Sequence, residues 1–421
     1  MQRRNSLKLS KDSGQNNFRW NYSCAILNGV FYNAANAFIG GSTVLPLFVS
    51  TLTSSKFMVG LISTMEGATW PLPQIFVASL IEHKDRKKPL YIYMAILRSL
   101  IILIIGLFII FFYGTTPKYA FLTLFVLLFF TYSIAGGISG ISFMDIVGKS
   151  FPSNRRGSLW GWRMGIGGSL GVIFGFVVRF IIKNINYPIN FGVLFLIATF
   201  FISIALLSFS LIKEPVSNTV IKERKTFHTF LSEGLKTLKQ DKRFKNLFFS
   251  RISFGINAMS TPFYIIFVKQ HHNIPLNNVG FFVSAQISGG IISNLLWGGL
   301  SNYKGNHLVL RLAALVTALP PILVFTSYLF NPNLIFDLSI FFLLGFGIQG
   351  IWVGFPNALL DISPENKRPT YVGFMNTMIA PVLFLPTVGG LIIDYVSFNS
   401  LFVLSLLASI SAFIFATKFK P

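Results

Sequence analysis

One acidic side chain lies where acids are costly, in the middle of a long apolar segment. Glu66 falls near the centre of residues 57–81, and Trp70 and Gln74 follow at four-residue steps, on the same helix face. An ionised group at the bilayer centre costs at least about 2.5–3.5 kcal/mol on insertion scales, so it needs a reason to be there. A carboxyl group there can load and release a proton, and the indole and amide can contact an organic molecule.

A second polar stripe occurs at an offset of 220 residues. Shifting Glu66 and Gln74 by that offset gives Gln286 and Asn294. Polar groups at matching positions of two related helices are not explained by packing against lipid, so we expect both stripes to line a cavity. The alternative is that Gln286 and Asn294 only hydrogen-bond to neighbouring helices.

Further polar residues in other apolar segments are candidates for the same cavity. Asn33 and Asn36 share a face of the first segment, and Asn257 matches Asn36 at an offset of 221. Arg163 lies about two turns into the fifth segment, where it can contact an anionic solute or pair with Asp145. The remaining candidates for solute binding are Gln349, Trp352 and Asn376. For the amides, helix packing is the competing interpretation.

Charged residues gather at the segment ends on one predicted side of the membrane. The turn after the fourth segment and its counterpart after the tenth are both bracketed by acids and bases, which suits a gate that latches two bundles together. Solvated turns are the simpler alternative. The gating candidates are Asp85, Arg86, Asp145, Arg155, Arg156, Asp361, Lys367 and Arg368.

The elements that must position these residues are membrane-spanning helices. Hydrophobic residues make up 53% of the chain and charged residues only 11%. Because lipid cannot satisfy exposed backbone groups, and short alternating strands are lacking, we expect an all-α integral membrane protein. Twelve apolar segments are predicted, at residues 22–50, 57–81, 89–113, 117–147, 157–182, 190–213, 246–270, 276–300, 307–331, 333–362, 371–394 and 397–417.

The sequence repeats itself about half its length apart. The run from Pro152 to Gly157 returns as Pro364 to Pro369, and Val59-Gly60 returns as Val279-Gly280. Such a duplication is typical of a transporter with its site between two six-helix halves. We therefore predict bundles at 22–213 and 246–417, a linker at 214–245 and tails at 1–21 and 418–421. Within the linker, apolar residues at helical spacing predict a basic amphipathic helix on the lipid surface or, alternatively, a partner-binding helix.

The net charge of +22 follows the predicted topology. Basic residues fill the N-terminal tail, the linker and the even-to-odd turns, which predicts cytoplasmic termini, contact with membrane lipids and no role in nucleic-acid binding. The single cysteine, Cys24, excludes a disulfide framework, and the first apolar run is too long for a cleaved signal peptide. His271-His272 is interpreted as a solvated loop rather than a metal site. We expect no cofactor, no metal and a monomer.

These features resemble the major facilitator superfamily from Tyr22 to Thr417. The most specific match is Pro152-x-x-x-Arg156-Gly157 with Gly161, which is similar to the turn between the fourth and fifth spans of many prokaryotic members. In the turn between the second and third spans, where the family has Gly and Asp, this chain has Ser79 and His83. The resemblance implies two pseudo-symmetric six-helix bundles.

The leading hypothesis is a secondary transporter in the cytoplasmic membrane. It would move a small organic solute by alternating access, with Glu66 coupling transport to protons. An uncoupled facilitator and a non-transporting solute sensor are the alternatives. A membrane enzyme is disfavoured, because the sequence has no phosphate-binding glycine loop, no H-E-x-x-H and no paired His/Asp cluster.

Overall fold

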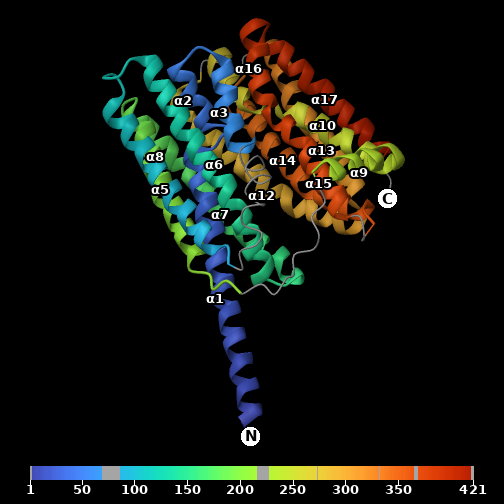
Figure 1. Ribbon diagram of the computed structural model, residues 1–421. Coiled ribbons are helices and arrows are strands. Elements are labelled where there is room, and N and C mark those ends of the chain that lie inside the picture. Colours follow the sequence, from blue (N-terminus) through green and yellow to red (C-terminus); the bar gives the residue numbers. More distant parts are fainter. Residues whose placement is uncertain are drawn as a thin grey trace. The chain divides into compact units, whose positions relative to one another are not determined.

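The computed structural model describes residues 2–68, 86–215, 227–272, 274–330, 332–364 and 368–418 (Figure 1). Within these ranges the chain forms α-helices and short 3-10 helices joined by brief connections. Ten of the described helical stretches are long and apolar enough to cross a membrane. The expected all-α, multi-pass architecture is therefore confirmed.

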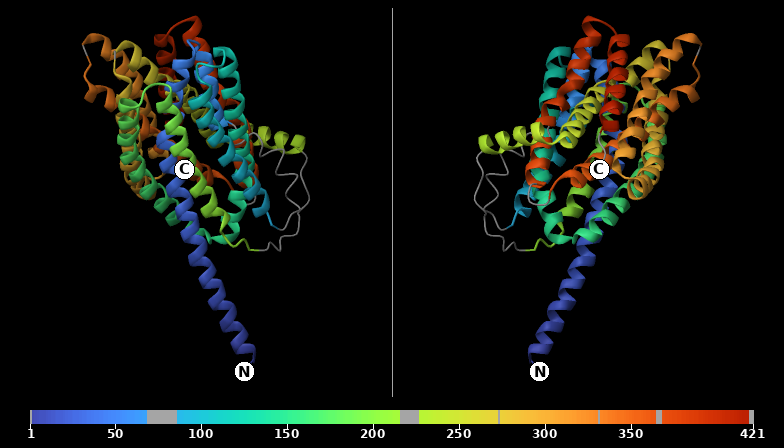
Figure 2. Two further views of the ribbon diagram at one scale, coloured as in Figure 1. Left: turned by 90° about the vertical axis from the view of Figure 1, so that its left-hand side faces the viewer. Right: turned by 90° about the vertical axis from the view of Figure 1, so that its right-hand side faces the viewer.

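The helices of the first half follow the first six predicted segments. α3 covers only the start of the second segment, whose remainder lies outside the described residues. The bounds are α1 (Gln2–Ile39), α2 (Val44–Leu52), α3 (Lys56–Ala68), α5 (Lys88–Phe112), α6 (Lys118–Ser150), α7 (Ser153–Asn184) and α8 (Ile189–Ser210). α1 begins well before its predicted span and extends past the other helices of its compact unit (Figure 2).

The second half supplies a linker helix and the other six segments. Its helices are α9 (Phe227–Gln240), α10 (Lys242–Ala258), α11 (Tyr264–His271), α12 (Val279–Lys304), α13 (Asn306–Thr326), α14 (Leu334–Ile362), α15 (Arg368–Ile379), α16 (Leu385–Tyr395) and α17 (Phe398–Lys418). α10 and α11 together form the predicted seventh segment, and α15 and α16 together form the eleventh.

Three predicted spans are broken helices, and two of the breaks are related by the repeat. Gly40 separates α1 from α2, and Thr261 lies in the 3-10 turn between α10 and α11, an offset of 221 residues. Gly40 and Gly41 explain the first break, since glycine lacks a side chain that would favour the helix. Pro262 explains the second, because proline cannot donate the helical hydrogen bond. Broken helices at repeat-related positions are a common feature of transporter binding sites.

The chain divides into two compact units, of which the first is built around α1, α5, α6, α7 and α8. Unit 1 comprises residues 1–39, 69–174 and 185–221. α5 and α8 approach closely because Gly106 and Gly192 face the partner helix: a Cβ at Gly106 would lie 2.9 Å from the Leu196 side chain. Asn28 of α1 donates to the carbonyl of Ala205 in α8 at 2.8 Å. Small residues and buried amides of this kind are the usual means of packing helices in lipid.

Unit 2 contains the second half of the sequence together with pieces of α1–α3 and α7. It comprises residues 40–68, 175–184 and 222–421. Its tightest helix pair is α12–α14, in which Gly289 lies against the carbonyl of Phe342 and Gly345 lies against the carbonyl of Gln286. In each case the neighbour is backbone, which cannot move aside. The α12–α14 crossing therefore depends on glycine at both positions.

The linker helix packs against unit 2 along one of its faces. Gly234 of α9 faces the ring of Phe374 in α15, and Leu238 packs against the hydrophobic core of unit 2. Leu235, on another face, is 42% exposed. A helix is thus present where the amphipathic pattern predicts one, and Leu238 contacts the apolar cluster that includes Phe244 and Phe374.

We expect Gly345→Ala to destabilise the protein and Gly299→Ala to leave its stability unchanged or slightly higher. A methyl group at Gly345 would collide with α12 backbone, whereas one at Gly299 would meet nothing within 4 Å. Overpacking of this kind costs about 1–3 kcal/mol. Thermal unfolding of the two variants in detergent tests this, and equal midpoints would contradict the close approach of α12 and α14.

Candidate functional site

Two of the predicted solute-binding amides lie together on the α12–α14 pair. Gln286 is half-buried on α12, and Gly290, one turn later, lies against the side chain of Gln349 on α14. Ser42, from the break between α1 and α2, donates a hydrogen bond to Oε1 of Gln286 at 3.0 Å. A helix break therefore contacts a polar stripe within unit 2. Ser42 was missed in the sequence, although Gly40-Gly41-Ser42 inside an apolar segment is a signal of a broken helix.

The other candidates of unit 2 have separate positions. Asn294 is half-buried on α12, Asn376 is exposed on α15, and Trp352 is 67% exposed on α14. None of the three is joined to Gln286 by a hydrogen bond in the described structure. The exposed indole of Trp352 is available to a ring-bearing solute or to lipid.

Asn257 takes part in a buried polar cluster. Its amide nitrogen lies 2.9 Å from Oγ of Ser405 and 2.8 Å from Oγ of Ser409, both on α17, and 3.2 Å from the carbonyl of Thr317 on α13. Asn257 thus joins three helices beside the α10–α11 break, as the packing alternative proposed. Its repeat counterpart Asn36 is half-buried in α1.

Arg163 is held inside unit 1 by α1. Its Nη1 donates to the carbonyl of Ala25 at 2.7 Å and to Oδ1 of Asn28 at 2.9 Å, and its guanidinium lies over the rings of Phe143 and Trp160. In this structure Arg163 is not paired with Asp145.

The neighbouring helices of unit 1 add two further contacts near α1. Asn33 donates to the carbonyls of Gly29 and Arg163. Arg98 of α5 is likewise buried, and it donates to the hydroxyls of Tyr32 and Tyr132. The part played by these tyrosines was missed, because nothing in the sequence pairs them with an arginine.

A hollow of ≈ 550 Å³ runs along one face of α7 in unit 1. Small and apolar residues at helical spacing line it, and a Cβ at Gly161 or Gly165 would meet nothing within 4 Å. The lining residues are Ser158, Gly161, Trp162, Gly165, Ile166 and Ser169. The volume lies within the range typical of small-molecule sites. This hollow was not predicted, although the run of glycines in the fifth segment is a sequence signal for a helix face without large side chains.

Asp145 has two basic partners within unit 1, so its role in a gate between bundles stays a prediction. Lys87, just before α5, contacts Asp145 Oδ1 at 2.8 Å, and Lys149 contacts Oδ2 at 2.6 Å. Glu214 accepts hydrogen bonds from the backbone N–H groups of Lys87 and Lys88, both at 2.9 Å, and so caps the start of α5. Lys87 and Glu214 were not among the predicted gating residues.

The remaining gating candidates have simpler surroundings. Arg156 donates to the carbonyls of Gly148 and Phe151 and thereby caps the end of α6. Asp361 accepts from the amide of Asn306 at 2.7 Å. Arg86 and Arg155 are exposed. Arg368 begins α15, and Glu66 lies in the last turn of α3. The candidates Trp70, Gln74, Asp85 and Lys367 lie outside the described residues.

The sequence-based interpretation of His271-His272 as a solvated loop is wrong for His272, whereas His271 is the last residue of α11 and is exposed. Nδ1 of His272 lies 2.6 Å from Oδ1 of Asp337 on α14, and the two side chains are 4% and 0% exposed. Nε2 of His272 is 3.1 Å from Oγ of Ser327. The interpretation was wrong because the acid is 65 residues away in the sequence. Burial lowers the pKa of His271, whose ring stacks on Phe267.

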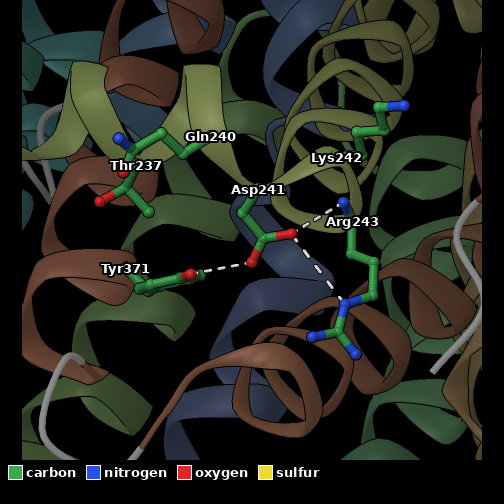
Figure 3. Close-up of a pocket in the computed structure, with 6 residues that line it drawn as sticks. All are labelled: Thr237, Gln240, Asp241, Lys242, Arg243 and Tyr371. Atoms are coloured by element: carbon green, nitrogen blue, oxygen red, sulfur yellow. Dashed lines mark hydrogen bonds and ion pairs between the residues drawn. The ribbon is translucent and has the colours of Figure 1, made fainter.

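A polar pocket of ≈ 490 Å³ lies where the linker meets the start of α15 (Figure 3). Asp241 accepts hydrogen bonds from the N–H groups of Arg243 and Phe244, which caps α10, and from the hydroxyl of Tyr371 at 2.8 Å. The carboxylate thus ties the linker to α15. The pocket is lined by Thr237, Gln240, Asp241, Lys242, Arg243 and Tyr371.

A seam in unit 2 joins α3, from the first half of the sequence, to α16, from the second half. Gly60 lies against the backbone of Pro386 and Thr387. One turn further along α3, Oγ1 of Thr64 is 3.0 Å from Oγ1 of Thr387. At Gly60 the backbone of α3 therefore approaches the backbone of α16 directly.

This set of features defines a class of protein. The structure has the features expected of a polytopic membrane transporter. These are membrane-length helices, helix breaks related by the repeat, a hollow faced by glycines and a seam between the two sequence halves.

Comparison with known proteins names the family. The family model described as Major Facilitator Superfamily matches residues 24–382 and 247–421, so the chain belongs to that family. A comparison with curated proteins found no match. As a member of this family the protein is a membrane transporter and not an enzyme.

Solved structures of transporters share the fold at low sequence identity. A POT family transporter in complex with 5-aminolevulinic acid has a TM-score of 0.69 at 13% identity, covering 95% of this chain and 97% of that chain. The nucleoside transporter NupG has a TM-score of 0.69 at 14% identity, covering 95% and 100%. A bacterial homologue of the iron transporter ferroportin, in an inward-facing state, has a TM-score of 0.68 at 13% identity, covering 95% and 98%. These identities establish the fold alone.

We expect His272 and Asp337 to depend on each other for their contribution to stability. Removing one partner of a buried hydrogen bond typically costs about 1–3 kcal/mol, because the other partner is left unsatisfied. His272→Gln and Asp337→Asn should each lower the unfolding midpoint strongly, and the double variant should lose much less than the sum of the two. Thermal unfolding of all four proteins measures this coupling. His271→Gln is the control and should have a smaller effect, and strictly additive losses would refute the pairing.

Proposed function

We propose that this protein is a secondary transporter of a small organic solute that works by alternating access in the cytoplasmic membrane, with both termini in the cytoplasm. The single observation that carries the proposal is the α3–α16 seam. It joins the two sequence halves at one end through glycine backbone and a hydroxyl pair, at Gly60 and at Thr64–Thr387. Such contacts form and separate without drawing charged groups out of a buried environment. The positive-inside distribution of charge supports placing this end on the outer side of the membrane.

Each unit, taken by itself, offers groups that suit contact with an organic solute. In unit 2, Ser42, Gln286 and Gln349 supply a hydroxyl and two amides next to a helix break. In unit 1, the hollow along α7 supplies an apolar wall that includes Trp162. An organic molecule with polar edges suits this chemistry better than an inorganic ion does. The similar structures include a transporter bound to 5-aminolevulinic acid and a nucleoside transporter, which agrees with a small organic solute.

A thermal-shift screen of the purified protein against metabolite libraries identifies the solute, because a ligand that binds the folded state raises the unfolding midpoint. Flux of that solute in proteoliposomes then separates a transporter from a sensor, since a sensor binds its ligand without moving it.

Cross-linking the seam tests alternating access directly. In a Cys24→Ser background, Thr64→Cys with Thr387→Cys should form a disulfide on mild oxidation, because the native hydroxyl oxygens are 3.0 Å apart. We expect oxidation to abolish solute flux and a reductant to restore it. Each single cysteine variant is the control and should transport under both conditions. Full flux through the oxidised double variant would refute alternating access at this seam.

For energy coupling we propose a proton carried by Glu66. A carboxyl group near the bilayer centre is hard to ionise, and it can therefore exchange a proton during the transport cycle. Glu66→Gln should abolish accumulation driven by a pH gradient and preserve solute binding and exchange. Uptake into proteoliposomes with and without an imposed gradient measures this. Gradient-independent flux of the native protein would favour the uncoupled facilitator instead and would remove Glu66 from the mechanism.

A further inference from the structure

The end of α16 carries a carboxylate that binds the beginning of α3. Oδ1 of Asp394 accepts a hydrogen bond from the backbone N–H of Lys56 at 2.8 Å. Oδ2 accepts one from the N–H of Phe57 at 2.9 Å and one from the hydroxyl of Ser55 at 3.1 Å. Both carboxylate oxygens are thus used on a helix that lies 338 residues away in the sequence.

This contact has a specific electrostatic basis. The first N–H groups of a helix have no partners within the helix, and the helix dipole places partial positive charge at the same end. A carboxylate there satisfies two of those groups with charge-assisted hydrogen bonds. The surroundings add positive charge, since the Lys56 ammonium lies within electrostatic reach of both Asp394 and Lys269.

The backbone near Asp394 is shaped for the contact. Gly390, one turn before Asp394, lies against the carbonyl of Lys56, and a Cβ at this position would also come within 2.7 Å of Cα of Phe57. A larger residue would push the two helices apart and draw the carboxylate out of hydrogen-bonding range. Gly390 and Asp394 therefore act together, the glycine by permitting the approach and the acid by binding at its end.

We propose that Asp394 is a latch that holds the predicted outer end closed and so sets how often the transporter opens there. The proposal rests on the alternating-access function proposed above. Asp394 bonds α3 only while the α3–α16 seam is closed. When the seam opens, the carboxylate and the freed N–H groups of Lys56 and Phe57 are left to water. The contact therefore stabilises one conformation over the other, which is the requirement for a residue that shifts a conformational equilibrium.

The strength of the latch suits a reversible gate. Asp394 is exposed overall, so water competes for its oxygens when the helices separate. A carboxylate at an exposed helix N-terminus favours the bound arrangement by about two- to fivefold in an equilibrium constant. A deeply buried ion pair at this position would hold the end shut far more strongly and would slow the cycle.

The test measures how accessible the seam is from outside. In a Cys24→Ser background, Thr64→Cys places a reporter at a position that is 1% exposed while the seam is closed. Labelling of intact cells with a membrane-impermeant maleimide then reports the open fraction. We expect Asp394→Asn and Asp394→Ala to raise the labelling rate by about two- to fivefold, as the loss of this interaction would allow. Tyr395→Ala is the matched control at the same helix end and should leave the rate unchanged, because Tyr395 is 85% exposed.

Unchanged labelling in both Asp394 variants would overturn the latch. Asp394→Asn keeps the size and one acceptor of the native side chain, so it provides a folded variant for the comparison if Asp394→Ala unfolds. The cross-linking experiment separates the two proposals. Flux blocked by the Thr64–Thr387 disulfide with unchanged labelling in Asp394→Asn would reject the latch alone, whereas unblocked flux would reject the transport mechanism on which it rests.

Discussion

Every feature of this molecule depends on one constraint, which is that a backbone N–H or carbonyl inside lipid must find its partner within the protein. The constraint makes each span a helix and makes each interruption of a helix an event that needs compensation. At the α1–α2 break, the N–H groups of Thr43 and Leu45 turn back to the carbonyl of Gly40. At the α10–α11 break, Ser260 donates to the carbonyl of Asn257. Polar side chains collect at these breaks because they replace the missing helical bonds, and a solute can use the same groups.

The same constraint governs the charges. The buried cations of unit 1 are not neutralised by a described carboxylate: Arg98 bonds to tyrosine hydroxyls and Arg163 to a carbonyl and an amide. Three of the described carboxylates instead cap helix N-termini, those of Glu214 on α5, Asp241 on α10 and Asp394 on α3. Of these three, Asp394 is exposed, so water can replace its hydrogen bonds and its cap costs far less to break than a buried ion pair.

Much of this architecture was predictable from the sequence. Apolar length predicted the spans and the repeat offset pointed to Gln286, because each rests on a periodic property of the chain. The two helix breaks were not predicted, although the structure places them at repeat-related positions. Choices of partner were not predictable in the same way. His272 contacts Asp337, and Asp394 binds the start of α3. Both contacts arise from the way the helices pack, which no residue spacing in the sequence reveals. The linker helix shows the same limit, since its amphipathic pattern is the same whether Leu238 faces lipid or Phe374.

The open face of α7 has a consequence for how the protein diversifies. Gly161 and Gly165 border the hollow, and a side chain added at either would touch no neighbouring atom within 4 Å. Elsewhere in the molecule a comparable change at Gly289 or Gly345 would strike backbone. Substitutions in the wall of the hollow therefore do not disturb the packing of the helices around it. Under the solute contacts proposed above, single substitutions there would change the wall offered to a solute at little cost in folding, so related chains could acquire new selectivity while keeping the same set of helices.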